Sequence, residues 1–195
     1  RVALSFIALF WPAILCSQNF NGGFNFYLPP QDITSQKFLP YFPPQPISGN
    51  DFVTVDVAGH FSVQNQPRRF FGVNCAADGA FPLTSKAWFI AGRLRKFGFN
   101  LVRFHHLDNP WSQESLFEWG KDTRHLNPLT LDRLENFLAE LKRNGIYANM
   151  NLHVGRTFNF RDGVPNSDSL ADFAKGVTYF DPQLITMQKE YAKQL

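Results

Sequence analysis

The sequence predicts an α/β protein in which strands and helices alternate over the second part of the chain. Two stretches, residues 84–97 and 130–144, repeat apolar residues at the i, i+3, i+4 and i+7 spacing of an amphipathic helix. Each stretch ends at a glycine, Gly98 or Gly145, and a short apolar strand follows directly. Repeated βα units imply a parallel sheet. The 195 residues, 44% hydrophobic and 18% charged, are enough for one globular domain of this class.

A β-hairpin is predicted to open the regular structure. Residues 52–55 and 60–63 are short runs of strand-forming residues that flank a turn containing Gly59. A third, Phe-rich strand is predicted over residues 69–74. From that strand onward, the pattern changes from a hairpin to alternating strands and helices.

Three helices are predicted from their N-terminal signals. We expect Thr84 and Thr130 to cap the first two helices, and Asp181 followed by Pro182 to form the N-cap and first position of the third. The loops after the helices are very short, whereas the loops after the strands span residues 106–129 and 153–180. Because the loops after parallel strands carry function in α/β folds, we expect the functional residues on that side.

The N-terminus is predicted to be a signal peptide over residues 1–18. Residues 2–15 form an apolar run that is shorter than the roughly 20 residues of a membrane-spanning helix. A secreted or periplasmic protein without a membrane span is therefore expected. Lipid anchoring at Cys16 is the alternative, but Ala13 and Leu15 stand where a lipobox has Leu and a small residue.

Residues 19–50 are predicted to form an irregular arm, rich in Pro and aromatic residues, that packs on the surface of the domain over residues 51–195. If cleavage removes Cys16, Cys75 is left alone and no disulfide is possible. The charge of +3 comes from 19 basic and 16 acidic residues without a Lys/Arg run. This distribution argues against a nucleic-acid partner, and no protein partner is evident.

Polar side chains follow the carboxyl ends of the three strands predicted for the parallel sheet. Strand periodicity places Arg103 and His105 on one face, and Asn151 and His153 on one face of the next strand. Asn74 ends the first strand. Because a buried parallel strand is normally apolar throughout, these side chains predict a polar cavity at the strand ends.

Three further residues extend this candidate site, namely His106, Asp108 and Trp111. His105 and His106 are adjacent, so they should face opposite sides while the strand stays extended, which disfavours a shared metal ion. No Gly-x-Ser-x-Gly elbow and no Gly-rich phosphate loop is present. No metal or cofactor is therefore predicted, although a metal-dependent hydrolase stays open as a lesser alternative.

Carbohydrate chemistry fits the candidate site better. Arg, His and Asn side chains bind hydroxyl groups, and the Trp111 indole can stack on a sugar ring. Structural roles are the competing interpretations: Arg103 as a buried, satisfied charge, His106 as a capping or core residue, and Trp111 as ordinary loop packing.

At these residues the chain resembles the secreted cellulase-like proteins of the clan A glycoside hydrolases, which are (β/α)8 barrels related to family 5. The matching segments are residues 59–61, 69–74, 98–109, 131–134, 145–147, 151–153 and 179–182. The resemblance implies an incomplete (β/α)8 barrel, namely an N-terminal hairpin and the first three βα units. A complete barrel typically has about 250 residues.

The resemblance also implies a retaining glycosidase acting on a β-linked poly- or oligosaccharide. Its acid/base and nucleophile glutamates are expected C-terminal to this sequence, so no catalytic residue is assigned here and the chain alone is expected to be inactive. Arg103 would hold the nucleophile ionised, and His153, with His105 and His106, would bind the sugar. A noncatalytic carbohydrate-binding barrel is the alternative.

Overall fold

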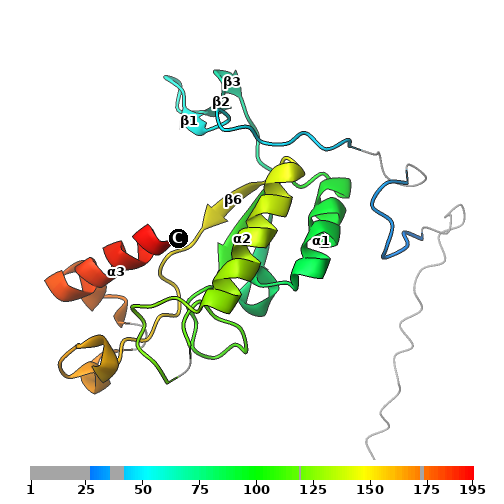
Figure 1. Ribbon diagram of the computed structural model, residues 1–195. Helices are drawn as coiled ribbons and strands as arrows, with labels where there is room; N and C mark the ends of the chain where they lie inside the picture. Colours follow the sequence, from blue (N-terminus) through cyan, green and yellow to red (C-terminus); the bar gives the residue numbers. More distant parts are fainter. Residues whose placement is uncertain (1–26, 36–41, 119, 172–173) are drawn as a thin grey trace, which may run out of the picture.

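The computed structural model describes residues 27–35, 42–118, 120–171 and 174–195 (Figure 1). The predicted signal peptide lies outside these residues. The described chain contains two three-stranded sheets and three α-helices. In chain order the elements are β1 (Val53–Val55), β2 (Phe61–Val63), β3 (Gln66–Pro67), β4 (Gly72–Ala76), η1 (Ala77–Ala80), α1 (Thr84–Lys96), β5 (Leu101–His105), α2 (Pro128–Arg143), β6 (Tyr147–Met150), η2 (Phe160–Asp162), η3 (Ser167–Ser169), η5 (Val177–Tyr179) and α3 (Pro182–Gln194).

The predicted hairpin is confirmed. Strands β1 and β2 pair antiparallel, with Val53 opposite Val63, and β3 adds a short third strand. Gly59 has φ +83°, a left-handed conformation that suits a glycine in the turn. The Asp56 carboxylate accepts the backbone N–H groups of Ala58 and His60 at 2.9 and 2.8 Å, which closes the turn.

The predicted parallel sheet is also confirmed, with the strand order β4-β5-β6. Helices α1 and α2 pack beside each other and cover one face of this sheet (Figure 1). On that face Val102 and Phe104 are fully buried, and the Phe104 ring meets Phe137 of α2 edge-on. The opposite face carries exposed polar side chains, including Asn74 and Arg103.

The expected (β/α)8 barrel is wrong. The described residues form a separate antiparallel sheet and a three-stranded parallel sheet, and α1 and α2 lie side by side on the parallel sheet (Figure 1). Helix α3 instead buries Leu184 and Met187 in a second apolar cluster with Phe158 and Val164 of the preceding loop. The Asp181-Pro182 capping signal located the start of this helix correctly, but a capping signal does not specify which surface the helix packs against.

The helix starts are predicted with mixed success. Thr84 is the first residue of α1 rather than its cap. Helix α2 is capped by Asn127, whereas Thr130 donates its hydroxyl to the carbonyl of Ser115 at 2.8 Å. Asp181 caps α3 as predicted, accepting two N–H groups at 2.8 and 2.9 Å. None of the described helices has the length and apolar character needed to cross a membrane.

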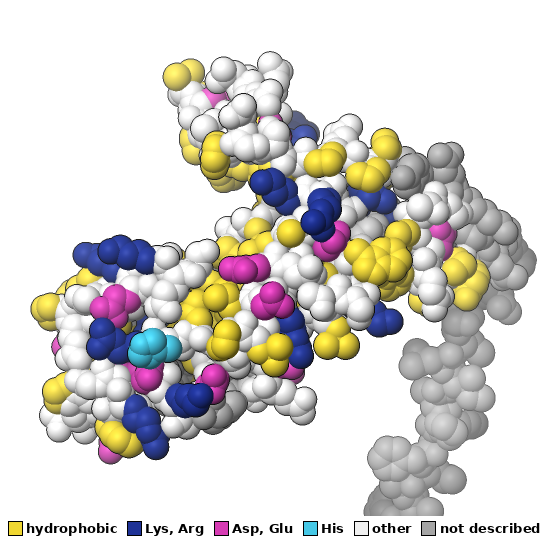
Figure 2. Space-filling model, viewed as in Figure 1, with side chains coloured by type: hydrophobic (Ala, Val, Ile, Leu, Met, Phe, Trp, Pro, Cys, Tyr) yellow, Lys and Arg dark blue, Asp and Glu magenta, His cyan; other side chains and the backbone are white. Residues whose placement is uncertain are grey.

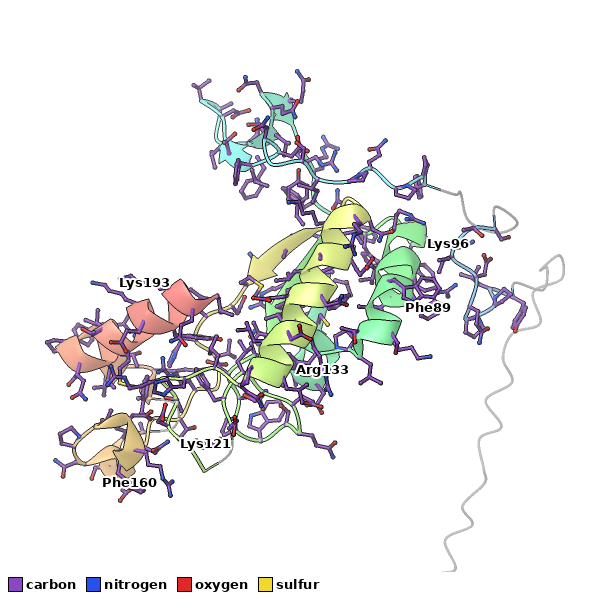
Figure 3. All side chains as sticks on the ribbon, viewed as in Figure 1. Phe89, Lys96, Lys121, Arg133, Phe160 and Lys193 are labelled. Atoms are coloured by element: carbon purple, nitrogen blue, oxygen red, sulfur yellow. The ribbon has the colours of Figure 1, made fainter. Side chains whose placement is uncertain are left out.

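The described part of the arm packs on α1, as predicted. The Lys96 ammonium group is fully buried, lies 3.0 Å from the Asp32 carboxylate and also donates to the carbonyl of Ser35. Arg93 donates to the carbonyls of Pro29 and Asp32 at 3.0 and 2.6 Å. Figure 3 labels Lys96 at the end of α1 that faces this segment. Two cations of one helix therefore hold the arm.

A second contact joins the arm to the loop after α2. Ile47 donates its N–H to the carbonyl of Lys142 at 3.0 Å. Gly145 has φ +74°, and a Cβ at this position would lie 2.6 Å from the carbonyl oxygen of Gln45. Both the backbone conformation and the close approach of the arm therefore require a glycine here.

Replacing the buried amine tests how strongly the arm is held. Lys96→Met keeps the length of the side chain but removes both polar contacts, so we expect a loss of about 2 kcal/mol in unfolding free energy. Limited proteolysis should cut residues 29–35 faster in this variant. Lys86→Met, at an exposed position of α1, is the control. Equal cleavage rates in the two variants would contradict a role for Lys96 in holding the arm.

Candidate functional site

The candidate site lies on the open face and at the carboxyl ends of the parallel strands. The strand register places Asn74, Arg103 and Asn149 side by side, and all three are exposed. Arg103 donates from Nη1 to Oδ1 of Asn74 at 3.2 Å. Arg103 is thus an exposed cation rather than a buried one.

His105 ends strand β5 and is joined to the next segment through Asn151. The distance between Asn151 Nδ2 and His105 Nδ1 is 3.0 Å. With the amide nitrogen as donor, Nδ1 accepts and the imidazole proton resides on Nε2. Burial, together with the nearby His106 and Arg103, lowers the pKa of His105 below its usual value. A neutral His105 therefore offers an N–H donor at the edge of the site.

The structure brings His106 to the side of His105, and the expectation that they face apart is wrong. Strand β5 ends at His105, and His106 adopts φ +59°, which breaks the alternation of an extended strand. The two ring centroids lie 4.3 Å apart. The Trp111 ring lies 5.1 Å from His106 and is 58% exposed. These three rings form a continuous aromatic and imidazole surface.

Asp108 is 2% exposed and its carboxylate is directed at the backbone of the loop after β6. Oδ2 accepts the N–H groups of Val154 and Arg156 at 2.9 and 3.1 Å, and Oδ1 accepts that of Gly155 at 3.0 Å. Three charge-assisted hydrogen bonds occupy both oxygens. Asp108 therefore holds two loops together and does not belong to the exposed polar row.

His153 follows the end of β6 and stacks on Phe158, with 6.2 Å between the ring centroids. It is half-buried. Two residues beyond it, Gly155 is fully packed against Asn109. The predicted residues thus divide into an exposed row around Arg103, the three-ring surface around His106, and the loop positions of Asp108 and His153.

Arg156, which also follows the third parallel strand, is buried rather than directed to the site. Its guanidinium group donates to the backbone carbonyls of Thr123 and Met187 at 2.6 and 3.2 Å. The rings of Phe117, Phe158 and Tyr191 surround it at 4.6 to 5.6 Å. Burial lowers the pKa of Arg156 to about 10, so it stays charged at neutral pH.

A cleft of about 250 Å³ is lined by Asp108, Asn109 and Pro110 together with residues of the loops that follow β5 and β6. Its charged lining includes Glu118, Lys121 and Arg161, and Lys121 forms an ion pair with Glu118. Figure 3 labels Lys121 in this loop region. Basic and acidic side chains are interspersed around α3 on the face shown in Figure 2, without a patch of one sign.

Two findings bear on which chemistry can be assigned to the site. The described residues contain no group of three or more His, Cys, Asp or Glu side chains that could hold a metal ion. No protein-family model, curated protein or solved structure matches the chain. The chemistry of the site therefore rests on its own donors, acceptors and rings.

Removing the charge of Asp108 tests its loop contacts. Asp108→Asn replaces one acceptor oxygen by an N–H₂ group that faces a backbone N–H, so we expect a loss of about 3 kcal/mol in unfolding free energy. Urea unfolding measures this loss. Asp132→Asn, at an exposed position of α2, is the control and should change stability little. A similar small effect at Asp108 would refute the contacts described above.

The lowered pKa of His105 predicts a pH dependence. Between the folded and the ordinary histidine pKa of about 6.5, the unfolded chain binds more protons than the folded chain, so stability falls as the pH decreases through this window. An NMR titration of the His105 ring should give a pKa below 6.5. His105→Gln should reduce the slope of stability against pH. A titration midpoint above 6.5 would contradict the described environment.

Proposed function

We propose that this chain forms part of the sugar-binding site of a secreted glycoside hydrolase that acts on a β-linked poly- or oligosaccharide. The observation that carries the proposal is the exposed Asn74–Arg103 pair at one side of the site and the exposed Trp111 ring at the other. Hydrogen-bonding side chains match the hydroxyl groups at the edge of a pyranose, and a flat apolar ring matches the C–H groups on its face.

The polar row supplies groups that suit sugar hydroxyls. Arg103 has N–H groups that Asn74 does not use, and Asn149 lies in register beside it. His105 contributes its Nε2–H when Nδ1 accepts from Asn151. These groups present several donors with a fixed spacing, because the strands that carry them are hydrogen-bonded to each other.

The ring surface supplies the apolar contact. The Trp111 indole is exposed beside the His106 ring, so a sugar ring laid on the indole can reach an imidazole at its edge. Aromatic faces contribute large contact areas with little loss of side-chain freedom. A hydrolase requires two carboxyl groups about 5 Å apart for retention. These glutamates are not members of the described cluster, and the proposal places them elsewhere in the protein.

One observation favours a second candidate, a noncatalytic carbohydrate-binding protein. Asp108, the carboxylate nearest to the ring surface in sequence, has both oxygens engaged by backbone N–H groups. The cluster itself therefore offers binding groups and no free acid. For both candidates, the apolar run over residues 2–15 supports secretion.

Affinity electrophoresis of the chain in gels that contain carboxymethylcellulose, xylan or mannan tests the proposal. We expect retardation in at least one gel. Trp111→Ala should weaken this binding about tenfold, since loss of a stacking ring costs roughly 1.5 kcal/mol. Trp88→Ala is the matched control, because Trp88 is 52% exposed but lies on α1.

Equal mobility of the wild-type chain with and without each polysaccharide would overturn the proposal. Equal loss of binding in the two Trp variants would show that Trp111 is not the contact. Arg103→Ala should also lose binding to the polysaccharide. Because the gel measures binding without any hydrolysis, this variant tests sugar recognition separately from hydrolysis.

A further inference from the structure

The left-handed backbone of His106 places its ring in the candidate site. A residue with a Cβ atom rarely adopts this conformation, and surrounding contacts must hold it. The Nδ1 atom of His106 is buried and has no hydrogen-bond partner among the described residues. Since no bond to Nδ1 orients the ring, its position depends on the backbone and on packing against Trp111 and His105.

Asn109 makes the contacts that hold this backbone. Its Nδ2 donates to the carbonyl of His106 at 2.6 Å. Its Oδ1 accepts the N–H groups of Trp111 and Ser112 at 3.2 and 2.8 Å. Asn109 is fully buried, so solvent cannot replace these bonds. One amide side chain thus fixes the segments that carry both rings.

Gly155 fixes Asn109 from the other side. A Cβ at position 155 would lie 2.9 Å from Cβ of Asn109 and 3.0 Å from its Cα. The N–H of Gly155 donates to Asp108 at 3.0 Å, which holds the glycine at this distance. The loop after β6 therefore presses Asn109 against the turn that contains His106.

We infer that Asn109 is the positioning residue of the site: it holds His106 in the left-handed conformation and Trp111 beside it, so that the imidazole and indole form one ligand-contacting surface. The role in binding rests on the proposed function. The role in positioning does not, and it is measurable without any ligand.

NMR spectroscopy of the whole chain tests the positioning. The wild-type protein should show nuclear Overhauser contacts between the His105 and His106 rings, and ring-current shifts of His106 from Trp111. Asn109→Ala should remove both signals and weaken binding to the polysaccharide that retards the wild-type chain about tenfold. Asn159→Ala is the control, because the Asn159 side chain also bonds to backbone groups, but these belong to Lys121 and Arg161 and not to residues 105–112. It should leave both readouts unchanged.

A second variant and a double-mutant cycle serve if Asn109→Ala does not fold. Asn109→Asp keeps an acceptor oxygen for the N–H groups of Trp111 and Ser112, but it sets a carboxylate oxygen against the carbonyl of His106 in place of the amide donor. The cost of burying the new charge is common to both backgrounds of the cycle, so it cancels in the comparison. Glycine adopts φ +59° without strain, so a protein with His106→Gly no longer needs Asn109 to hold this conformation. Asn109→Asp should therefore change the unfolding equilibrium constant about fivefold less in the His106→Gly background than in the wild-type background.

Each outcome decides one proposal. Persistence of the ring contacts in Asn109→Ala, or an equal cost of Asn109→Asp in both backgrounds, overturns the positioning role. Loss of the same signals in Asn159→Ala also overturns it, because the effect would then be general loosening. A wild-type chain that binds none of the three polysaccharides refutes the proposed function, while the NMR result still stands for the positioning of His106.

Discussion

The Asp108 carboxylate joins the loop after β5 to the loop after β6, and the structure at the carboxyl ends of the parallel strands depends on this junction. Its three hydrogen bonds to residues 154–156 connect the segment after β5 to the segment after β6. Arg156 then extends from this junction into the interior, where its guanidinium group bonds to Thr123 and to Met187 of α3. Asp108 and Arg156 together therefore connect the segment after β5, the segment after β6, Thr123 and the last helix. The energetic weight of these bonds comes from burial, since Asp108 and residues 154–156 are all buried.

The same junction explains why the candidate site has two unlike parts. The polar row around Arg103 is built on strands, so its spacing follows from the sheet register. The ring surface around His106 is built on a turn, so its geometry depends on side-chain to backbone bonds and on the packing of Gly155. The side chains on the strands should keep their positions when the loops change, whereas the rings on the turn should not. We expect the recognition of a ligand to be tuned at the turn and anchored at the strands.

Periodicity and capping signals were enough to locate most elements. The hairpin around Gly59, the parallel strands and the Asp181 cap follow from local rules, and the structure contains them. A barrel does not follow from local rules, because its closure depends on contacts between distant elements that no local pattern encodes. In the structure, α3 packs on Phe158 and Val164 instead. Within the site, the strand ends predict one polar cluster that contains Asn74 and Arg103, and the structure contains the hydrogen bond between them. Strand alternation fails at His106, where the left-handed conformation of this residue brings its own ring beside His105. The role of the Asn109 amide has no local signal, because Asn followed by Pro indicates a turn but not the partners of the side chain.

The buried amine of Lys96 has a consequence for where this domain begins. By composition, the arm over residues 19–50 and the domain over residues 51–195 are distinct, and residue 51 is a natural place to start a shortened protein. In the structure, the partners of Lys96 are Asp32 and Ser35, which belong to the arm. A protein shortened to residue 51 would leave Lys96 without both of these polar partners, and Gly145 without the backbone that it accommodates. The boundary in composition is thus not a boundary in folding, and the cooperative unit extends back at least to Pro29.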